Sequence, residues 1–201
     1  GGLDPNPPRN STVFFDDSAI LEVGSDVTIV DGIPNSEVYD GGQSIGVAFN
    51  SADGTFINRA NISVSSITSG GEVTGIASFV GQHTTRAGLI HNDTTGVIEL
   101  YNSFNTGQFD YHHGIFSVLS VVNDGRISLE TTAGRAYGIF IDRSEEYLTI
   151  ENNGHISVKS ADYAFGVGMY NVGPRLVNNG TIVVDGDRLS AGVETKDAQD
   201  A

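Results

Sequence analysis

One short phrase, Asn-X-Gly-X-Ile, recurs along this chain at a nearly regular interval. It stands at residues 123–127, 152–156 and 178–182, and looser copies stand at 58–62 and 94–98. The isoleucines that close these copies are 36, 29, 29 and 26 residues apart. A period of this length is typical of repeat proteins, in which each unit buries its apolar face against the next unit.

Each repeat carries three short segments that we predict to be strands. The phrase itself is one segment, a second contains Gly followed by Ile or Val, as in Gly138-Ile139, and a third precedes the Asn. Apolar residues alternate at period two, for instance Ile127 and Leu129, which indicates extended strands with one buried face. Helical spacing is sustained nowhere over a dozen residues. Three strands in 26–29 residues predict an all-β fold, a right-handed parallel β-solenoid (β-helix) of about six triangular coils.

The ends of the chain differ from its middle. Residues 1–10 contain three prolines and are expected to form an extended or disordered leader. Residues 11–40 have apolar, strand-like segments but no Asn-X-Gly phrase, and we interpret them as an N-terminal capping coil. Residues 41–195 then form the β-solenoid repeats, and residues 196–201 form an acidic tail.

Asparagine recurs at one corner of the repeat. Asn58, Asn123, Asn152 and Asn178 each stand four residues before a repeat isoleucine. When coils stack in register, the side-chain amide of one asparagine can donate a hydrogen bond to the amide oxygen of the next. We therefore predict a structural asparagine ladder at this corner rather than a ligand site.

Composition excludes several classes of function. Lys and Arg number 10 against 25 Asp and Glu, and the resulting net charge of −15 argues against nucleic-acid binding through phosphates. The chain has no cysteine, which excludes disulfides, thiolate metal sites and a cysteine nucleophile. No apolar run is long enough to insert into a membrane. The acidic pairs at 16–17, 145–146 and 185–187 lack the spacing of calcium loops, so we predict no metal or cofactor, with weak Ca²⁺ binding as the alternative.

The longest excursion from the repeat suggests where chemistry would be found. It separates the isoleucine at 98 from the Gly-Ile phrase at 114 and ends in Gln-Phe-Asp-Tyr-His-His. Loops that leave a solenoid commonly carry its function. If the protein is an enzyme, we expect Asp110, Tyr111 and His112 to supply acid–base chemistry on a sugar.

A structural interpretation of the same segment is favoured. His113 aligns with Tyr137 and Phe165 in the repeat, which predicts a column of stacked aromatic rings along the solenoid. No catalytic residue is therefore predicted. A third interpretation is a non-catalytic glycan-binding module in which exposed aromatic rings stack on sugars. The rings that would do so are Tyr101, Phe104, Phe109 and Tyr111.

The repeat resembles those of a known family. The phrase Asn-Asn-Gly-X-Ile-X-Val, followed about ten residues later by Ala-X-Gly-Ile/Val, is similar to repeats in the passenger regions of bacterial autotransporters. It also resembles other secreted right-handed parallel β-helix proteins, and the likeness covers residues 40–195. The resemblance implies an extracellular or bacterial cell-surface location and, most commonly, the role of an adhesin, which sometimes carries an enzyme.

These observations favour a structural or adhesive extracellular β-solenoid that is not an enzyme, either a segment of a surface adhesin or a filament subunit. The alternatives are a carbohydrate-active β-helix enzyme, such as a polysaccharide lyase or glycosidase, and the glycan-binding module. No cap follows the phrase at 191–193, and open strand edges pair readily, so self-association through the solenoid ends is expected. A glycan or a host or cell-surface receptor is the other expected partner.

Overall fold

The computed structural model of the chain describes residues 11–15, 20–30, 42–49, 53–66, 71–78, 87–103, 111–142, 148–170 and 174–196. These residues form nineteen β-strands and no helix, so the described part of the chain holds no helix that could cross a membrane. Every strand pairing among them is parallel.

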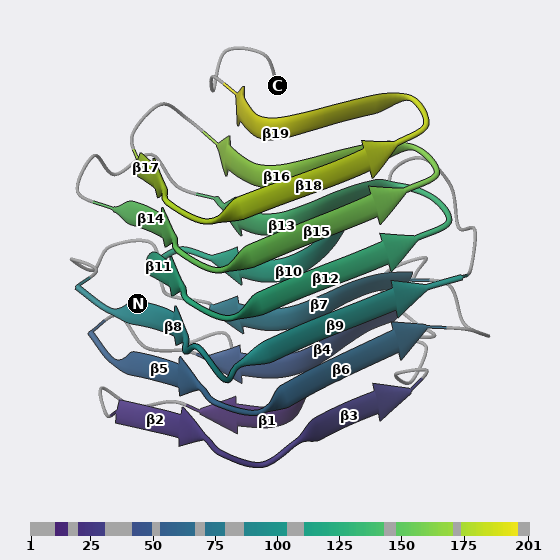
Figure 1. Cartoon of the computed structure of the whole chain (residues 1–201). Coiled ribbons are helices and arrows are strands. Elements are labelled where there is room, and N and C mark those ends of the chain that lie inside the picture. The colour runs from purple at the N-terminus through teal and green to yellow at the C-terminus, as the bar shows by residue number, and fades with distance from the viewer. Residues whose placement is uncertain are drawn as a thin grey trace, which may run out of the picture.

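The strands build three sheets (Figure 1). The first sheet holds, in spatial order, β1 (Ser11–Phe15), β4 (Gly42–Phe49), β7 (Gly71–Ser78), β10 (Tyr111–Ser117), β13 (Arg135–Ile141), β16 (Tyr163–Tyr170) and β19 (Leu189–Lys196). The second sheet holds β2 (Ile20–Val23), β5 (Thr55–Asn58), β8 (Leu89–Asn92), β11 (Ser120–Asn123), β14 (Thr149–Asn152) and β17 (Arg175–Asn178). The third sheet holds β3 (Val27–Val30), β6 (Asn61–Ser66), β9 (Val97–Asn102), β12 (Arg126–Thr131), β15 (His155–Ser160) and β18 (Thr181–Gly186).

The chain visits the second, third and first sheets in turn, so one coil consists of one strand from each sheet. Successive coils lie on one another and wind as a right-handed helix, from β2 at the bottom of Figure 1 to β19 at the top. The repeat isoleucines at 62, 98, 127, 156 and 182 are successive partners in the third sheet. The predicted fold, a right-handed parallel β-solenoid of about six coils, is confirmed.

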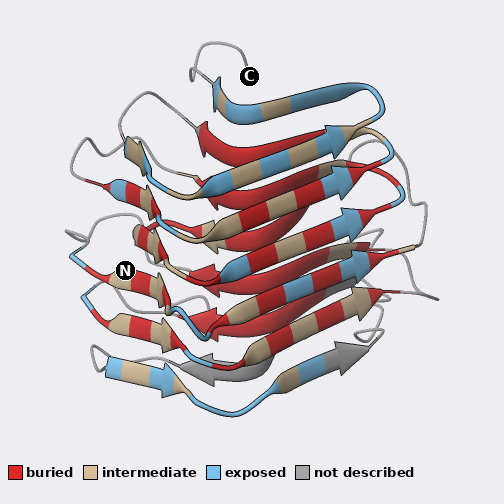
Figure 2. Ribbon diagram, viewed as in Figure 1, coloured by how far each residue is buried: buried red, intermediate tan, exposed pale blue. Residues whose placement is uncertain are grey.

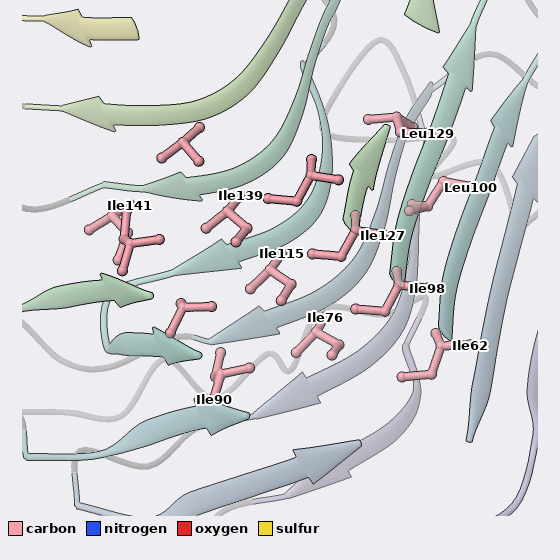
Figure 3. Close-up of a cluster of buried hydrophobic side chains, with 14 of the residues drawn as sticks. Ile62, Ile76, Ile90, Ile98, Leu100, Ile115, Ile127, Leu129, Ile139 and Ile141 are labelled. Carbon is pink, nitrogen blue, oxygen red and sulfur yellow. The ribbon is translucent and has the colours of Figure 1, made fainter. Parts of the chain in front are cut away.

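Inward-facing side chains fill the centre of the coils. In β12, Ile127 and Leu129 are buried whereas Arg126 and Glu130 are exposed. Figure 2 shows this alternation along the strands of the middle coils, while the strands of the two terminal coils are largely exposed or intermediate. Figure 3 shows isoleucines of the third sheet, such as Ile98, in the same cluster as isoleucines of the first sheet. Burial of these apolar side chains is the main stabilising contribution to the fold.

Asparagine side chains form a continuous ladder at the corner between the second and third sheets. Asn58 donates to Asn92 (2.9 Å), Asn92 to Asn123 (2.8 Å), Asn123 to Asn152 (2.7 Å) and Asn152 to Asn178 (2.7 Å), in each case from Nδ2 to Oδ1. The four asparagines expected from the repeat stand in this ladder, together with Asn92. All donors point the same way along the solenoid, an arrangement in which neighbouring hydrogen bonds polarise one another.

Glycine marks a bend in the strands of the first sheet. Tyr137 packs outside the core and Ile139 inside it, although period-two alternation would place both on one face. The residue between them is Gly138, where a Cβ would collide with the carbonyl oxygen of Gly166 and the side chain of Ile156. The bent backbones thus approach too closely for a larger residue, which explains the glycine of the second phrase.

The division of the chain into segments remains a prediction. Strands β1, β2 and β3 lie within residues 11–40, where a capping coil was expected, and pair with β4, β5 and β6 of the next coil. Residues 1–10 and 197–201, which include the expected leader and most of the expected acidic tail, lie outside the described residues.

Candidate functional site

A column of stacked rings runs across the outer face of the first sheet. His113 on β10, Tyr137 on β13 and Phe165 on β16 are register partners in adjacent strands. The ring centroids of His113 and Tyr137 are 5.7 Å apart, and those of Tyr137 and Phe165 are 4.8 Å apart, with interplanar angles of 16° and 17°. The aromatic column expected from the alignment of these three residues is therefore present.

Further rings extend this column into a cluster. Phe116 and Phe140 are partners three residues further along β10 and β13, with centroids 6.0 Å apart. Phe140 also lies 4.8 Å from the Tyr137 ring, and Phe116 lies 5.2 Å from the His113 ring. Tyr111 stacks at the other end of β10, with its centroid 6.4 Å from that of His113. Because the glycines at 114 and 138 occupy equivalent places in β10 and β13, the outward positions of these neighbouring strands bring their rings together.

These rings line a hollow of about 270 Å³, which we call the aromatic hollow. Its lining consists of Tyr111, His113, Phe116, Tyr137, Phe140 and the two acidic residues Glu72 and Asp142. Glu72 belongs to β7, and Asp142 directly follows β13, where its backbone N–H donates to the Ser117 carbonyl. The hollow is thus built by three consecutive coils, and two of these coils each contribute one acidic residue.

A change of side-chain size between neighbouring coils borders the hollow. On β7 the partners of His113 and Phe116 are Thr74 and Ala77, which are much smaller than the rings above them. The aromatic column consequently ends at β10, and Glu72 stands two residues before Thr74. The small side chains of β7 leave the outer face of the sheet lower beside the rings of β10, and a column of equally large rings would not leave this depression.

Burial shifts the pKa values of two ionisable groups of the hollow, His113 and Tyr137. Burial, together with the neighbouring His112, lowers the pKa of His113 from 6.5 to about 3, so its ring is neutral at physiological pH. Burial raises the pKa of the Tyr137 phenol above its ordinary value, as does a 2.7 Å hydrogen bond that its hydroxyl donates to Glu194. The other two polar residues of the lining are Glu72 and Asp142.

Cations of the protein itself already lie over rings beside the hollow. The guanidinium of Arg135 is 5.7 Å from the Tyr111 centroid and 5.4 Å from the Tyr163 centroid. Arg188 also lies 5.9 Å from the Tyr163 centroid. These distances are within the range of about 6 Å over which a ring face attracts a cation.

Comparison with known families identifies the chain. Residues 21–198 match the family described as the BigA third pectate lyase-like domain. The chain belongs to this family. No curated protein and no solved structure matches it. The family is of the parallel β-helix type, in agreement with the fold of this pectate lyase-like domain.

Two residues of the hypothetical catalytic set, Tyr111 and His112, face opposite sides of the first sheet. His112 is only 1% exposed and points inward, whereas Tyr111 belongs to the outer aromatic cluster. The Nδ1 atom of His112 accepts a 3.3 Å hydrogen bond from the Val73 N–H, and the ring N–H of His112 bonds to the backbone of Ala133. Burial lowers its pKa to about 4. His112 is therefore neutral at physiological pH and buried away from the outer face of the sheet, and Asp110 lies outside the described residues.

Of the four residues expected to form a glycan platform, the two that the structure describes lie on different sheets. Tyr101 is 43% exposed on β9 of the third sheet, whereas Tyr111 is on β10 of the first sheet and lines the aromatic hollow. Phe104 and Phe109 lie outside the described residues. The sequence did carry a signal for the rings it missed, since Phe116 and Phe140 each end the phrase aromatic-Gly-Ile-Phe.

No metal centre stands out in the described part of the pectate lyase-like domain. Within it, no group of three or more His, Asp or Glu residues is arranged to hold an ion. Asp185 and Asp187 line a second hollow of about 200 Å³, which they share with Glu130 and with Lys159, whose ammonium lies 3.1 Å from the Glu130 carboxylate. Weak Ca²⁺ binding remains a prediction from the sequence.

Proposed function

We propose that the chain is a non-catalytic binding domain of a bacterial surface or exported protein, in which a rigid β-helix presents the aromatic hollow to a sugar. In this proposal the domain is a segment of a surface adhesin or of an autotransporter-like passenger. The observation that carries the proposal is the aromatic hollow itself, because five rings and two carboxylates from three coils converge there. Sugars bind proteins by stacking their C–H faces on aromatic rings while their hydroxyls donate hydrogen bonds to carboxylates.

The surroundings of the hollow support binding rather than turnover. The rings that form it are held by stacking and by hydrogen bonds within the sheet, which is the preorganisation that a binding site needs. The one histidine of the lining, His113, is buried and neutral, so it does not support proton transfer at physiological pH. The acidic surface, with a net charge of −15, keeps such a rod soluble outside the cell.

Ring-truncation variants test this function. Tyr111→Ala and Phe116→Ala remove rings that are partly exposed in the hollow, whereas Tyr101→Ala removes an exposed ring on a different sheet and is the matched control. On a panel of bacterial, plant and animal glycans, we expect the first two variants to lose binding and the control to keep it. Loss of binding in Tyr101→Ala alone would place the site elsewhere and contradict the proposal.

A carbohydrate-active enzyme is the second candidate. Two carboxylates line one aromatic hollow, and glycosidases use such a pair as acid and base or nucleophile. The likeness of the family to pectate lyases also favours it. Incubation of the protein with the same glycans, followed by mass spectrometry, tests for cleavage. Cleavage that disappears in Glu72→Gln and in Asp142→Asn would establish this function in place of the first.

Association of copies through the solenoid ends is the proposed self-interaction. The strand edges of β17, β18 and β19 have no further coil over them within the described residues. Three apolar side chains of this coil are more than two-fifths exposed, namely Val183, Leu189 and Val193. Open edges of this kind pair readily with other strands. Negative-stain electron microscopy over a range of protein concentrations tests for end-to-end fibres.

A further inference from the structure

The C-terminal coil, which consists of β17, β18 and β19, has no further coil over it within the described residues. We propose that it is a docking surface for one further coil of the repeat type, brought by a β-helix partner that carries an amide side chain above Asn178. This inference rests on the proposed association at the solenoid ends and goes beyond it, because it names the kind of coil that this end fits best. Three features of the coil carry it, namely its bend glycine, its ladder asparagine and its inward apolar side chains.

The bend glycine of β19 has no neighbour in the described structure that requires it. Gly192 occupies the place on β19 that Gly166 occupies on β16, where a Cβ would lie 2.6 Å from the Gly192 carbonyl oxygen and would also collide with Ile182 of the next coil. The bend glycines of β4, β7, β10 and β13 are crowded in the same way by the coil that follows each of them. A Cβ at Gly192, by contrast, meets no atom within 4 Å. A further coil with a carbonyl oxygen and an isoleucine at these places would make glycine necessary here as well.

The asparagine ladder ends at this coil with a donor that lacks its ladder partner. Asn152 donates from Nδ2 to Asn178 at 2.7 Å, as each asparagine below it does to the next one. Among the described residues, the Nδ2 of Asn178 has only a 3.4 Å contact with the carbonyl oxygen of Gly180. An amide side chain in the next coil would supply the acceptor that continues the ladder.

The inward side chains of this coil leave an apolar surface at the end of the core. Three of them are half-buried and the fourth is 43% exposed, in the order Leu176, Ile182, Val184 and Val193. Their register partners one coil below are no more than 1% exposed, and these are Ile150, Ile156, Val158 and Val167. A further coil would bury the upper four side chains as this coil buries the lower four. The interface between coils would thus continue, and the hydrophobic effect favours its formation.

The first coil of another copy, which consists of β2, β3 and β4, fits this end less well. Val23 stands at its ladder position, as the register partner of Asn58. The Oδ1 of Asn58 accepts a 3.2 Å hydrogen bond from the N–H of Ala60, so the ladder needs no amide at that end. A valine above Asn178 would leave the amide donor buried without an acceptor, which costs stability. The partner coil is therefore of the repeat type rather than the first coil of this chain.

A chain lengthened by one coil tests the inference, with the added coil standing in for the partner. A second copy of residues 171–196 follows Lys196 directly, and because Lys196 is the register partner of Tyr170, the insert continues the solenoid in register. The insert brings its own asparagine, isoleucine and bend glycine. Hydrogen exchange measured by mass spectrometry compares the amides of β17, β18 and β19 in the two chains. We expect their exchange to become about a hundredfold slower in the lengthened chain, because this coil is then no longer the end of the solenoid.

Two substitutions identify the features responsible. Asn178→Val in the inserted copy alone gives the insert the valine of the first coil, and we expect it to reduce the added protection about tenfold. Gly192→Ala in the original coil should remove the added protection, because its Cβ would collide with the backbone of the insert. The same Gly192→Ala substitution in the chain of ordinary length is the matched control and should leave exchange unchanged. The amides of β10 and β12 in the middle coils show whether each variant keeps its fold.

The outcomes separate this inference from the association of copies. Unchanged exchange of β17, β18 and β19 in a lengthened chain whose middle coils stay protected would overturn the inference. Equal protection by the asparagine insert and the valine insert would also overturn it, since the first coil of a copy would then fit as well. Negative-stain electron microscopy of the chain of ordinary length shows whether copies form rods. Rods without protection by the insert would leave the association of copies intact, whereas protection by the insert with discrete particles at every concentration would support the inference and contradict that association.

Discussion

The phenolic hydroxyl of Tyr137 on β13 donates a 2.7 Å hydrogen bond to the carboxylate of Glu194 on β19, across the intervening strand β16. The ring can lean over β16 because residue 168 is a glycine. A Cβ at Gly168 would come within 2.6 Å of two carbons of the Tyr137 ring and within 2.7 Å of the Phe140 ring. This glycine therefore determines the position of two rings that line the aromatic hollow.

Substitution of this glycine should destabilise the protein. We expect Gly168→Ala to lower the free energy of unfolding by about 1–3 kcal/mol, because the new methyl group overpacks the ring cluster. Gly192→Ala on β19 is the control, since a Cβ there meets no atom within 4 Å, and its effect should stay within about 0.5 kcal/mol. Urea unfolding followed by circular dichroism measures the free energy of unfolding of both variants. Equal losses in the two variants would contradict the prediction, because they would mean that the rings move aside without a cost in stability.

The asparagine ladder gives a second prediction. Asn123 is fully buried, accepts a hydrogen bond from Asn92 and donates one to Asn152. Asn123→Ala removes both bonds and leaves buried polar atoms on its neighbours, so we expect a loss of about 2–4 kcal/mol in unfolding free energy. Asn178 ends the ladder at an exposed position, and Asn178→Ala should cost less than about 1 kcal/mol. Thermal unfolding of both variants compares them. Similar losses of unfolding free energy in the two variants would contradict the prediction that the buried, doubly bonded asparagine contributes more than the exposed one at the end of the ladder.

The fold was predictable because a solenoid repeats one set of requirements in every coil. The period, the alternation and the glycine phrase each reflect a contact with the next coil. Asn92 was missed because two additional residues separate it from Ile98, compared with the spacing of Asn123 from Ile127. The turn absorbs these residues, since Asn92 and Ile98 keep Asn123 and Ile127 as their register partners.

The site was less predictable for two physical reasons. The bend at Gly114 shifts the alternation by one, so that His112 and Ile115 both face inward and His113 faces outward. Period-two counting back from the inward Ile115 therefore assigns each side chain before the bend to the wrong face of the sheet. The hollow also depends on size differences between neighbouring coils, such as Phe116 against Ala77, which no single repeat reveals.

Acid pH should weaken the fold through the buried histidines. The folded-state pKa values of His112 and His113 are about 4 and about 3, below the usual 6.5, so the unfolded chain binds protons first as the pH falls. Their contribution to stability is present above pH 6.5 and decreases between pH 6.5 and the folded-state values. The expected loss is about 1.4 kcal/mol per pH unit for each histidine in this window.

The variant His113→Phe isolates one of these groups. Phenylalanine occupies the equivalent position on β16, so the ring column should accept the change. We expect the slope of unfolding free energy against pH between 6.5 and 4 to fall by about 1.4 kcal/mol per unit. Urea titrations at several pH values measure the slope. An unchanged slope would mean that His113 is protonated as easily in the folded protein as in the unfolded chain.

The unequal number of strands in the sheets predicts how copies associate. Among the described residues the first sheet has seven strands and the others six, because β1 lies under β4. If a second copy stacked on the C-terminal coil, its β1 would take the place next to β19. Its β2 and β3 would then lie one strand spacing, about 4.8 Å, too far from β17 and β18 to pair. Only one of the three sheets would continue from copy to copy.

Removal of β1 should therefore promote fibres. We expect deletion of residues 1–15 to let all three sheets continue across the junction and to increase end-to-end assembly, seen as longer rods by negative-stain electron microscopy. Leu189→Lys and Val193→Lys in the shortened chain place charges on the β19 edge and should suppress these rods. Circular dichroism checks that the shortened chain keeps its strands. Fibres of the full chain as long as those of the shortened chain would contradict the blocking role of β1, and discrete particles of both chains at every concentration would contradict end-to-end association itself.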